Sequence, residues 1–248
     1  MTHSYFATAR PHLLAHRGLS QHDSAVDENS IAAFRFAIEH GCTHIESDVH
    51  ATSDGIAVLF HDDDLNRVAG LNRKISEISF EELTTLQLKN GSTIPSLGEV
   101  LTEFPDLRLN LDIKSWAGVK PTALEIERHQ AHDRVLVSSF SSGRRKAAHA
   151  LLSRPVAASA GMTEVILLWL SHKFFGIGFG AIAKSIDALQ IPVSQGPIRL
   201  GTSKFISRAR KAGLEVHFWT INDPKLANHL VELGATGIVT DRVDLIRF

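Results

Sequence analysis

Residues 44–62 read HIESDVHATSDGIAVLFHD, and this stretch indicates two strands joined by a tight turn. Short apolar runs rich in β-forming residues lie at His44–Val49 and at Ile56–Phe60, as in strands. Asp54-Gly55 lies between them, and this dipeptide is a hairpin turn signal. The two segments are too close for a crossover helix, so we expect them to be antiparallel.

The same turn also predicts which polar side chains are neighbours. If it centres on Asp54-Gly55, then Asp48 lies roughly opposite His61 on the returning strand. Glu46 lies on the same face as Asp48, because side chains of a strand alternate with a period of two. The sequence therefore predicts a patch that contains Glu46, Asp48 and His61.

Outward from this hairpin, strand patterns alternate with amphipathic helical patterns along the chain. The other predicted strands are His12–His16, Arg108–Ile113, Val135–Phe140, Val156–Ala160, Ala188–Pro192, Glu215–Trp219 and Gly237–Thr240. Three of the joints share a helix that ends in glycine, at Glu39-His40-Gly41, Lys211-Ala212-Gly213 and Glu232-Leu233-Gly234, as at a helix C-terminus. Asn222-Asp223-Pro224 is a helix start signal.

This alternation favours a parallel sheet with helical crossovers. With one hairpin strand set aside, eight barrel positions remain, and about 250 residues suffice for a (β/α)₈ barrel. We therefore predict an α/β fold, a TIM barrel in which residues 1–248 form one domain. Residues 62–107 hold turn residues and two short helical patterns, and we expect them to form a small inserted cap between the second and third barrel strands.

Composition and charge exclude several classes of protein. The chain has 26 basic and 27 acidic residues and a net charge of −1, so it lacks the basic field that nucleic-acid binding needs. Cys42 is the one cysteine, which excludes an internal disulfide and favours a reducing compartment.

Met1–Pro11 lacks a signal-peptide pattern, and the longest apolar run, Val165–Leu170, is shorter than the roughly 20 residues of a membrane span. We expect a cytoplasmic protein without a stable membrane anchor.

Polar residues gather at the carboxyl ends of the predicted strands. They are His16, Arg17, Glu46, Asp48, His61, Asp62, Asp112, Lys114 and the segment Trp219–Asn222. In barrels this end of the strands carries the active site. Buried charges are costly unless they are paired or bind a metal, so a purely structural role does not explain so many of them in one place.

The residue types indicate cleavage of a phosphate ester. The three acids at 46, 48 and 112 offer oxygen ligands, which suit Mg²⁺ or Ca²⁺. Arg17 and Lys114 suit a phosphate group. His16 and His61 suit proton transfer.

The motifs around these residues resemble those of the glycerophosphodiester phosphodiesterase family over nearly the whole chain. They are Ala15-His16-Arg17-Gly18, Glu28-Asn29-Ser30, Ile45-Glu46-Ser47-Asp48-Val49, Phe60-His61-Asp62, Leu65-Asn66-Arg67, Ile94-Pro95-Ser96-Leu97 with Glu99-Val100-Leu101, Asp112-Ile113-Lys114, Trp219-Thr220-Ile221-Asn222 and Thr240-Asp241-Arg242. Each motif is weak alone, but their order and spacing together are highly specific.

The resemblance implies a barrel with an inserted cap and a divalent cation held by Glu46, Asp48 and the acid at 112. It implies that His16 and His61 act as general base and general acid, and Trp219 is a candidate for substrate contact. The family's substrates are deacylated phospholipids such as glycerophosphocholine, and its products are glycerol 3-phosphate and an alcohol. The resemblance also implies that the 2-hydroxyl of glycerol attacks phosphorus first, which gives a cyclic phosphate that water opens.

One position departs from the family pattern and keeps other functions open. Asp112 replaces the usual glutamate, so the third metal contact is longer, water-bridged or compensated by a backbone shift. The related sphingomyelinase D branch has aspartate at the matching place. An enzyme that acts on lysophospholipids, of lysophospholipase D or sphingomyelinase D type, and releases a cyclic phosphate is therefore one alternative. A catalytically inactive barrel that binds phosphodiesters is another.

Several residues have two interpretations from sequence alone. Asp62 is either a loop acid or the group that orients a histidine. Glu28 either orients a histidine or reaches the metal, while Asn29 or Ser30 caps a helix. Trp219 either packs inside the barrel or lines the substrate site. The histidines outside the motifs are expected to be surface or packing residues, namely His129, His132, His149, His217 and His229.

Overall fold

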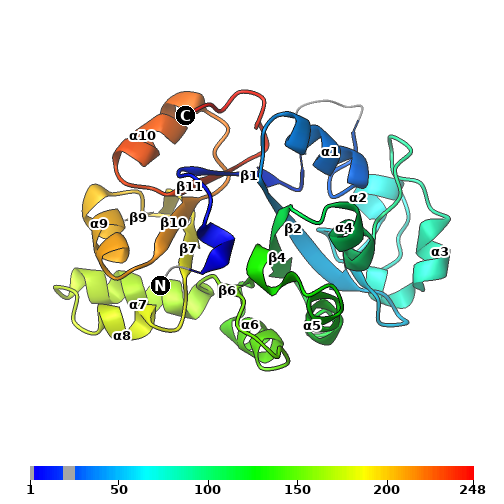
Figure 1. The fold of residues 1–248 in the computed structure, drawn as a ribbon, viewed down its shortest axis with the longest axis horizontal. Helices are drawn as coiled ribbons and strands as arrows, with labels where there is room; N and C mark the ends of the chain where they lie inside the picture. Colours follow the sequence, from blue (N-terminus) through cyan, green and yellow to red (C-terminus); the bar gives the residue numbers. More distant parts are fainter. Residues whose placement is uncertain (1–2, 19–25) are drawn as a thin grey trace.

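Eight parallel strands form a nearly closed barrel in the computed structural model, which describes residues 3–18 and 26–248 (Figure 1). They are β1 (His12–His16), β2 (His44–Ala51), β4 (Arg108–Ile113), β5 (Val135–Ser138), β6 (Ala157–Ala158), β7 (Ala188–Ile191), β10 (Glu215–Phe218) and β11 (Gly237–Thr240). Their order is β6-β5-β4-β2-β1-β11-β10-β7. A parallel bridge between Ser159 and Ala188 brings the two edges together. The predicted TIM barrel is confirmed.

Helices surround the barrel on its outer side (Figure 1). They are α1 (Ile31–Glu39), α4 (Leu97–Glu103), α5 (Val119–Arg128), α6 (Ser142–His149), α7 (Met162–Lys173), α8 (Phe179–Ala183), α9 (Ser203–Lys211) and α10 (Pro224–Glu232). Gly41, Gly213 and Gly234 follow α1, α9 and α10 with φ of 86°, 89° and 103°, so they are the predicted left-handed C-terminal glycines. Asp223 accepts a hydrogen bond from Lys225 N and caps α10, with Pro224 at its start.

The apolar core lies mainly between the barrel and its helices. One cluster joins β1, β2, β4 and β5 to helices α1, α4 and α5, with residues such as Phe34, Ile45 and Leu111 fully buried. A second cluster joins β7, β10 and β11 to α7–α10, around Phe205 and Val216. Because alternate strand residues face the helices, the other set faces the barrel interior. Those interior positions hold the histidines, acids and amides described below.

The hairpin is antiparallel as predicted, but its register is shifted by one residue. Strand β3 (Ala57–Leu59) pairs with β2 through Val49↔Leu59, and Phe60 N donates to Asp48 O at 3.0 Å. Asp48 therefore lies opposite Phe60, and its predicted alignment with His61 is wrong. Thr52 N donates to Ile56 O across the turn, so the loop has three residues, with Gly55 at a φ of 81°.

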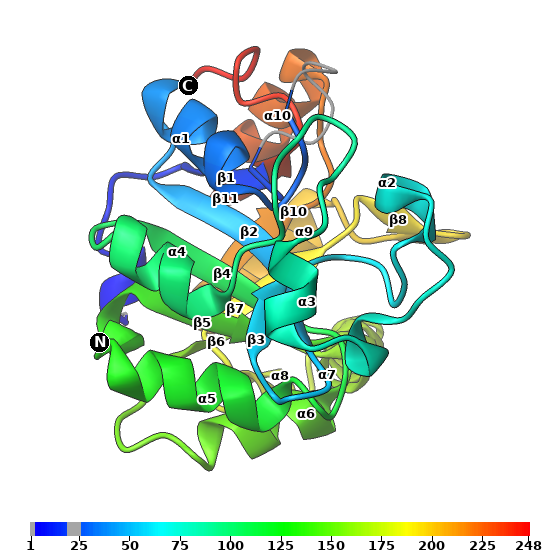
Figure 2. The same cartoon turned by 90° about the vertical axis from the view of Figure 1, so that its right-hand side faces the viewer.

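The segment between β3 and β4 has a small apolar cluster of its own. It contains α2 (Asn66–Ala69), η2 (Ile75–Glu77), α3 (Phe80–Thr84) and the barrel helix α4. Leu65, Ile75 and Leu83 pack together there with β3 residues such as Val58. Figure 2 shows α2 on the same side of the barrel as β8. Strand β8 (Ser194–Gln195) forms a short hairpin with β9 (Ile198–Arg199), which the sequence did not predict.

The amino-terminal end of the barrel is closed by the 3₁₀ helix η1 (Ser4–Phe6). Tyr5 and Phe6 are buried there, next to the buried rings of His12, His44 and His217. Burial lowers the pKa of His12 to about 4 and the pKa values of His44 and His217 to about 3. Of the two interpretations of His217 from sequence, packing is the one observed.

These buried histidines predict a fold that loses stability in mild acid. Each has a lower pKa in the folded chain than the 6.5 of the exposed imidazole, so the unfolded chain binds protons that the folded chain does not. Between about pH 6.5 and about pH 5, each should reduce the free energy of unfolding by about 1.4 kcal/mol per pH unit. Urea unfolding across that range measures the slope.

The matched variants are His44→Gln, which removes a buried imidazole, and His229→Gln, which removes an exposed one. We expect the slope to fall by about 1.4 kcal/mol per pH unit in the first variant and to stay unchanged in the second. An unchanged slope in both would contradict the prediction.

Candidate active site

The residues predicted to transfer protons, contact the substrate or bind the metal line one cavity of about 400 Å³ at the carboxyl ends of the strands. Its wall includes His16, Arg17, Glu46, Asp48, His61, Asp112, Lys114 and Trp219. Backbone pairing explains this convergence, because His16 is level with Glu46 and Asp48 is level with Asp112 in neighbouring parallel strands. All the predicted site residues therefore share one space.

Asp48 is the centre of a charged network. Lys114 Nζ lies 2.6 Å from Asp48 Oδ1 and 2.7 Å from Asp112 Oδ2, and Arg17 Nε lies 3.2 Å from Asp48 Oδ2. Burial opposes ionisation of Asp48, but the charges of Lys114 and Arg17 outweigh it and hold the pKa of Asp48 below its usual range. Asp48 is therefore an ionised carboxylate between two cations.

Glu46 differs from the other two acids, because no lysine or arginine of the described residues forms an ion pair with it. Among the described residues, the basic atom that lies closest to it is His16 Nε2, 3.8 Å from Oε2, and Oε2 is buried with no hydrogen-bond partner in that part of the chain. Burial, with the nearby charge of Asp48, raises the pKa of Glu46 to about 8. An orphaned carboxylate oxygen beside two further acids fits a bound hard cation, which would restore its ionised form.

The three acids do not yet form a compact ligand set. Among the described residues, Glu46, Asp48 and Asp112 are not a group whose ligand atoms all lie within 4.8 Å of one another. Within this group, the Lys114 ammonium group bridges Asp48 and Asp112. A cation that binds Asp48 and Asp112 would compete with the Lys114 ammonium group for their oxygens.

His16 and His61 each have an aspartate carboxylate at ring nitrogen Nδ1. His16 Nδ1 lies 2.6 Å from Asp241 Oδ1, and His61 Nδ1 lies 2.6 Å from Asp62 Oδ1. A carboxylate on Nδ1 fixes the ring and its tautomer, and it leaves Nε2 as the nitrogen that exchanges a proton. Of the two interpretations of Asp62, the geometry supports the one in which it orients a histidine.

Asp241 is a site residue to which the sequence analysis assigned no role. It follows β11, and Asn222 holds it by donating Nδ2 to Oδ2 at 2.8 Å and accepting the Asp241 N–H at 2.8 Å. Burial tends to lower the pKa of His16, but the hydrogen bond to Asp241 and the charge of Glu46 outweigh it and raise that pKa. The available signal was an acid directly after a predicted strand in the Thr240-Asp241-Arg242 motif.

Glu28 and Asn29 support the site from the segment before α1. Glu28 Oε1 accepts from Arg17 Nη1 at 3.2 Å and from Arg67 Nη2 at 2.5 Å, so it orients arginines. Asn29 Oδ1 accepts a hydrogen bond from Ser47 Oγ at 2.7 Å, and Asn29 Nδ2 donates one to Asp48 Oδ2 at 3.4 Å. Ser30 is the cap of α1 and accepts from Ala33 N. The helix-cap interpretation therefore holds for Ser30.

The other side of the cavity is apolar. Phe140, Met162, Val165, Leu200 and Trp219 line it, and the rings of Phe140 and Trp219 meet edge to face with centroids 6.1 Å apart. Trp219 therefore lines the cavity, as one of its two interpretations expected. The cavity thus offers charged groups for one part of a ligand and an apolar wall for another.

A chain of hydrogen bonds forms the floor of the cavity. Ser138 Oγ donates to Asn110 Oδ1 at 3.0 Å, and Asn110 Nδ2 donates to Gln190 Oε1 at 3.2 Å. Gln190 Nε2 lies 3.2 Å from His217 Nδ1. The chain connects the cavity to the buried histidines at the opposite end of the barrel.

Replacing Asp241 by asparagine should impair proton transfer by His16 and leave the shape of the cavity nearly unchanged. The amide is nearly isosteric, but it cannot stabilise the protonated imidazole, and it favours the wrong tautomer. We expect kcat to fall about 10²-fold with KM changed less than about threefold. Steady-state kinetics across pH measure this, and the kcat profile should lose its His16 limb. An unchanged kcat would show that Asp241 does not position His16.

This parallel barrel has two oriented histidines, three acids and two basic side chains, Arg17 and Lys114, at the carboxyl ends of its strands. Such a site defines the class of barrel enzymes that act on anionic substrates. Comparison with known proteins is more specific. Residues 16–245 match the family model described as "Glycerophosphoryl diester phosphodiesterase family". The chain belongs to this family of phosphoric diester hydrolases.

Curated relatives agree with this assignment. The chain is 39% identical over 236 residues to "Probable glycerophosphodiester phosphodiesterase 2" of Mycobacterium tuberculosis, a match that covers 94% of this chain and 88% of the relative. It is 27% identical over 252 residues to a lysophospholipase D of Homo sapiens, covering 86% of this chain and 79% of that protein.

Solved structures have the same fold. A phosphodiesterase of Oleispira antarctica, in complex with the product sn-glycerol-3-phosphate, matches with a TM-score of 0.73 and 26% identity over 94% of this chain and 93% of that one. A glycerophosphodiester phosphodiesterase of Thermotoga maritima matches with a TM-score of 0.74 and 25% identity over 96% and 97%. No helix in the described ranges has the length and hydropathy of a membrane span.

Proposed function

We propose that this chain hydrolyses glycerophosphodiesters to glycerol 3-phosphate and an alcohol, with His16 and His61 as its proton-transfer pair. The observation that carries the proposal is the pair of histidine–carboxylate contacts, His16–Asp241 and His61–Asp62, each 2.6 Å long and both facing one cavity. The names of the Mycobacterium tuberculosis relative and of the product complex from Oleispira antarctica support the substrate class.

The two histidines have complementary roles in this proposal. One accepts the proton of the glycerol 2-hydroxyl at Nε2 as its oxygen attacks phosphorus, and the other protonates the departing alcohol oxygen. The products of this step are a cyclic phosphate and the alcohol. Water then opens the cyclic phosphate with the proton roles reversed, which gives glycerol 3-phosphate.

Positive charge around Asp48 prepares the cavity for the phosphate. Arg17 and Lys114 lie on the carboxylates at 48 and 112 and can contact phosphate oxygens that enter between them. A divalent cation, Mg²⁺ or Ca²⁺, held by Glu46, Asp48 and Asp112 would stabilise the charge that develops on those oxygens. Asp112 is a methylene shorter than glutamate, so its reach toward such a cation depends on release from Lys114.

Product analysis tests the proposal directly. Purified protein with Mg²⁺ or Ca²⁺ is incubated with glycerophosphodiesters that differ in their alcohol, and phosphorus NMR follows the phosphate. We expect glycerol 3-phosphate to accumulate, with a cyclic phosphate only as a transient species. A cyclic phosphate that persists would instead assign the chain to the cyclising alternative. Binding without turnover of any substrate would overturn the proposal in favour of an inactive barrel.

A lysophospholipid is a second candidate substrate, and the apolar wall of the cavity favours it. Phe140, Met162 and Val165 give an acyl chain a surface that a small headgroup such as choline does not need. The human relative named as a lysophospholipase D supports this candidate. In this reaction the same phosphodiester chemistry acts on a larger alcohol or on an acylated glycerol.

Met162→Glu separates these substrates. Met162 lies at the start of α7 and lines the cavity, so a carboxylate there opposes an acyl chain but not a glycerol headgroup. We expect KM for a lysophospholipid to rise about tenfold or more and KM for glycerophosphocholine to change less than about twofold. Ile177→Glu, an exposed position outside the cavity wall, is the control and should leave both values unchanged. An equal effect of Met162→Glu on both substrates would exclude the apolar wall as an acyl site.

A further inference from the structure

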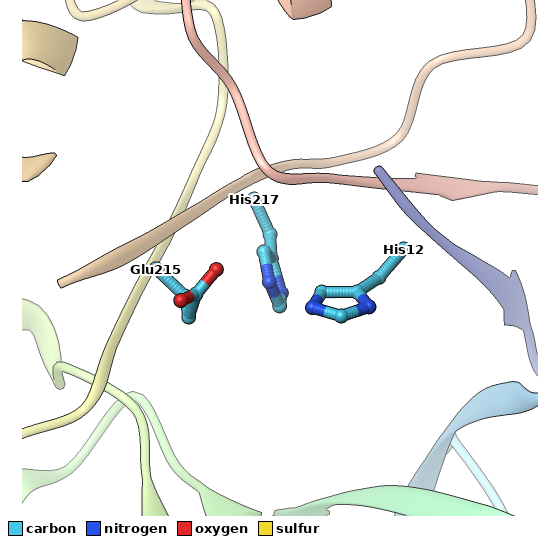
Figure 3. A group of neighbouring side chains, drawn as sticks. All are labelled: His12, Glu215 and His217. Carbon is cyan, nitrogen blue, oxygen red and sulfur yellow. The ribbon is translucent and has the colours of Figure 1, made fainter. Parts of the chain in front are cut away.

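A second group of possible metal ligands lies at the amino-terminal end of the barrel, away from the cavity. His12 of β1 and Glu215 and His217 of β10 converge there (Figure 3). One ligand atom from each lies within 4.8 Å of the others, and the three residues are 1%, 2% and 0% exposed. The proposed reaction uses none of them.

The two ring nitrogens of His12, and likewise those of His217, differ in their contacts within the described part of the chain. His12 Nε2 and His217 Nε2 are buried and have no hydrogen-bond partner among the described residues. The other nitrogen of each ring is held, His12 Nδ1 by Thr8 Oγ1 at 3.0 Å and His217 Nδ1 by Gln190 at 3.2 Å. A ring held by a polar neighbour at one nitrogen and free at the other is the arrangement of a metal-binding histidine.

The surrounding backbone is shaped around these rings. Gly237 is the backbone partner of both His12 and His217, and a Cβ at Gly237 would lie 2.6 Å from His217 Cδ2. Glycine is therefore required between the two histidines. Phe6 covers the group from below, with its ring centroid 6.0 Å from that of His217 and 6.1 Å from that of His12.

Two arginines pair with Glu215, the third candidate ligand. Arg10 Nε lies 3.1 Å from Glu215 Oε2, and Arg210 Nη1 lies 3.2 Å from Glu215 Oε1. The side chains of Arg10 and Arg210 are 42% and 31% exposed, so they can turn toward solvent. Exchange of an arginine for a cation would keep the Glu215 carboxylate ionised and paired.

We propose that His12 Nε2, His217 Nε2 and a Glu215 carboxylate oxygen bind a transition-metal cation of the Zn²⁺ class, with water as a fourth ligand. Two imidazoles and one carboxylate suit Zn²⁺ or Co²⁺, whereas Mg²⁺ and Ca²⁺ prefer oxygen alone. The site is structural, because it ties β1 to β10 across β11 beneath the barrel. It is separate from the acids of the cavity.

Occupation requires a particular tautomer of His217. As the amides stand, Gln190 Nε2 faces His217 Nδ1, so the neutral ring carries its proton on Nε2. If the amide groups of Gln190 and Asn110 turn over, each keeps its contacts with donor and acceptor exchanged. Gln190 Oε1 then accepts a proton from His217 Nδ1, and Nε2 is free for the cation.

Zinc retention by the full chain tests the site. Protein stripped with a chelator is incubated with Zn²⁺ in the presence of excess Mg²⁺, which occupies oxygen ligands, and is then desalted and analysed by elemental mass spectrometry. We expect about one equivalent of zinc and a higher melting temperature than for the stripped protein. His217→Gln and His12→Gln should lose both effects.

His44→Gln is the matched control. His44 belongs to the same buried cluster, but its Nε2 contacts Tyr5 O at 3.4 Å and its Nδ1 contacts Thr43 Oγ1 at 2.9 Å, so this variant should retain the zinc. No zinc retention by the wild-type chain, or equal retention by His217→Gln, would overturn the proposal.

A crystallographic measurement covers the case in which the variants do not fold. Anomalous scattering at the zinc edge from zinc-soaked wild-type crystals should give a peak between His12 Nε2 and His217 Nε2. A peak at the carboxylates of the cavity alone would refute the site.

Discussion

The His16→Ala variant is expected to lose about 10³- to 10⁴-fold in kcat, and His61→Ala is expected to lose a similar amount. Each removes the Nε2 atom that exchanges a proton with a reacting oxygen in the proposed mechanism, while the acids, Arg17 and Lys114 stay in place. KM should therefore change far less than kcat. Steady-state kinetics with glycerophosphocholine measure both quantities.

The control for these variants is His229→Ala, because His229 is an exposed histidine on α10. Circular dichroism should show an intact fold in all three proteins. The double variant His16→Ala/His61→Ala should be little slower than either single variant, since the proposed mechanism uses the two groups in the same step. Full activity in either single variant would refute the proposal that His16 and His61 are the proton-transfer pair.

Removing divalent cations should be the second-largest effect. Glu46 has a buried carboxylate oxygen without a hydrogen-bond partner among the described residues, beside Asp48 and Asp112, and this donor set is suited to a hard cation. EDTA should lower kcat by about 10²- to 10³-fold, the equivalent of several kcal/mol of transition-state stabilisation. Mg²⁺ or Ca²⁺ should restore it, and titration of activity with each ion identifies the better one.

Two variants locate that cation. Asp112→Glu should lower the concentration of Mg²⁺ or Ca²⁺ needed for half-maximal activity, because the longer side chain reaches past Lys114. Glu215→Gln, at the opposite end of the barrel, should leave that concentration unchanged. Activity that does not change with EDTA would contradict a cation in the cavity. A changed half-maximal concentration in Glu215→Gln would indicate that the activating ion binds at the amino-terminal end of the barrel and not in the cavity.

Much of the barrel could be predicted from sequence because its signals are local. The strands His12–His16, Arg108–Ile113 and Gly237–Thr240 are observed with the bounds expected, since apolar runs and terminal glycines act within a few residues. The hairpin register could not be predicted, because one residue of loop length decides it. The loop has three residues and ends at Gly55, and with this length Asp48 lies opposite Phe60 and not opposite His61.

The partners of the site residues were harder to predict than the residues themselves. Asp241 lies 225 positions from His16, and it meets His16 only because β11 and β1 are neighbours in the barrel. Lys114 was expected at a phosphate, and the fold places it between two acids. The buried group of His12 and His217 depends in the same way on β1, β11 and β10 being adjacent, which periodicity within one segment cannot indicate.

The chain of side chains on the cavity floor has a polarity. Every donor in Ser138, Asn110 and Gln190 points away from the cavity and toward His217. If Gln190 and Asn110 turn over when a cation takes His217 Nε2, the polarity of the whole chain reverses. Ser138 Oγ then accepts from Asn110, and its own proton is free to face the phosphate. A cation at the base of the barrel would thus change the cavity floor from a hydrogen-bond acceptor to a donor without moving the backbone.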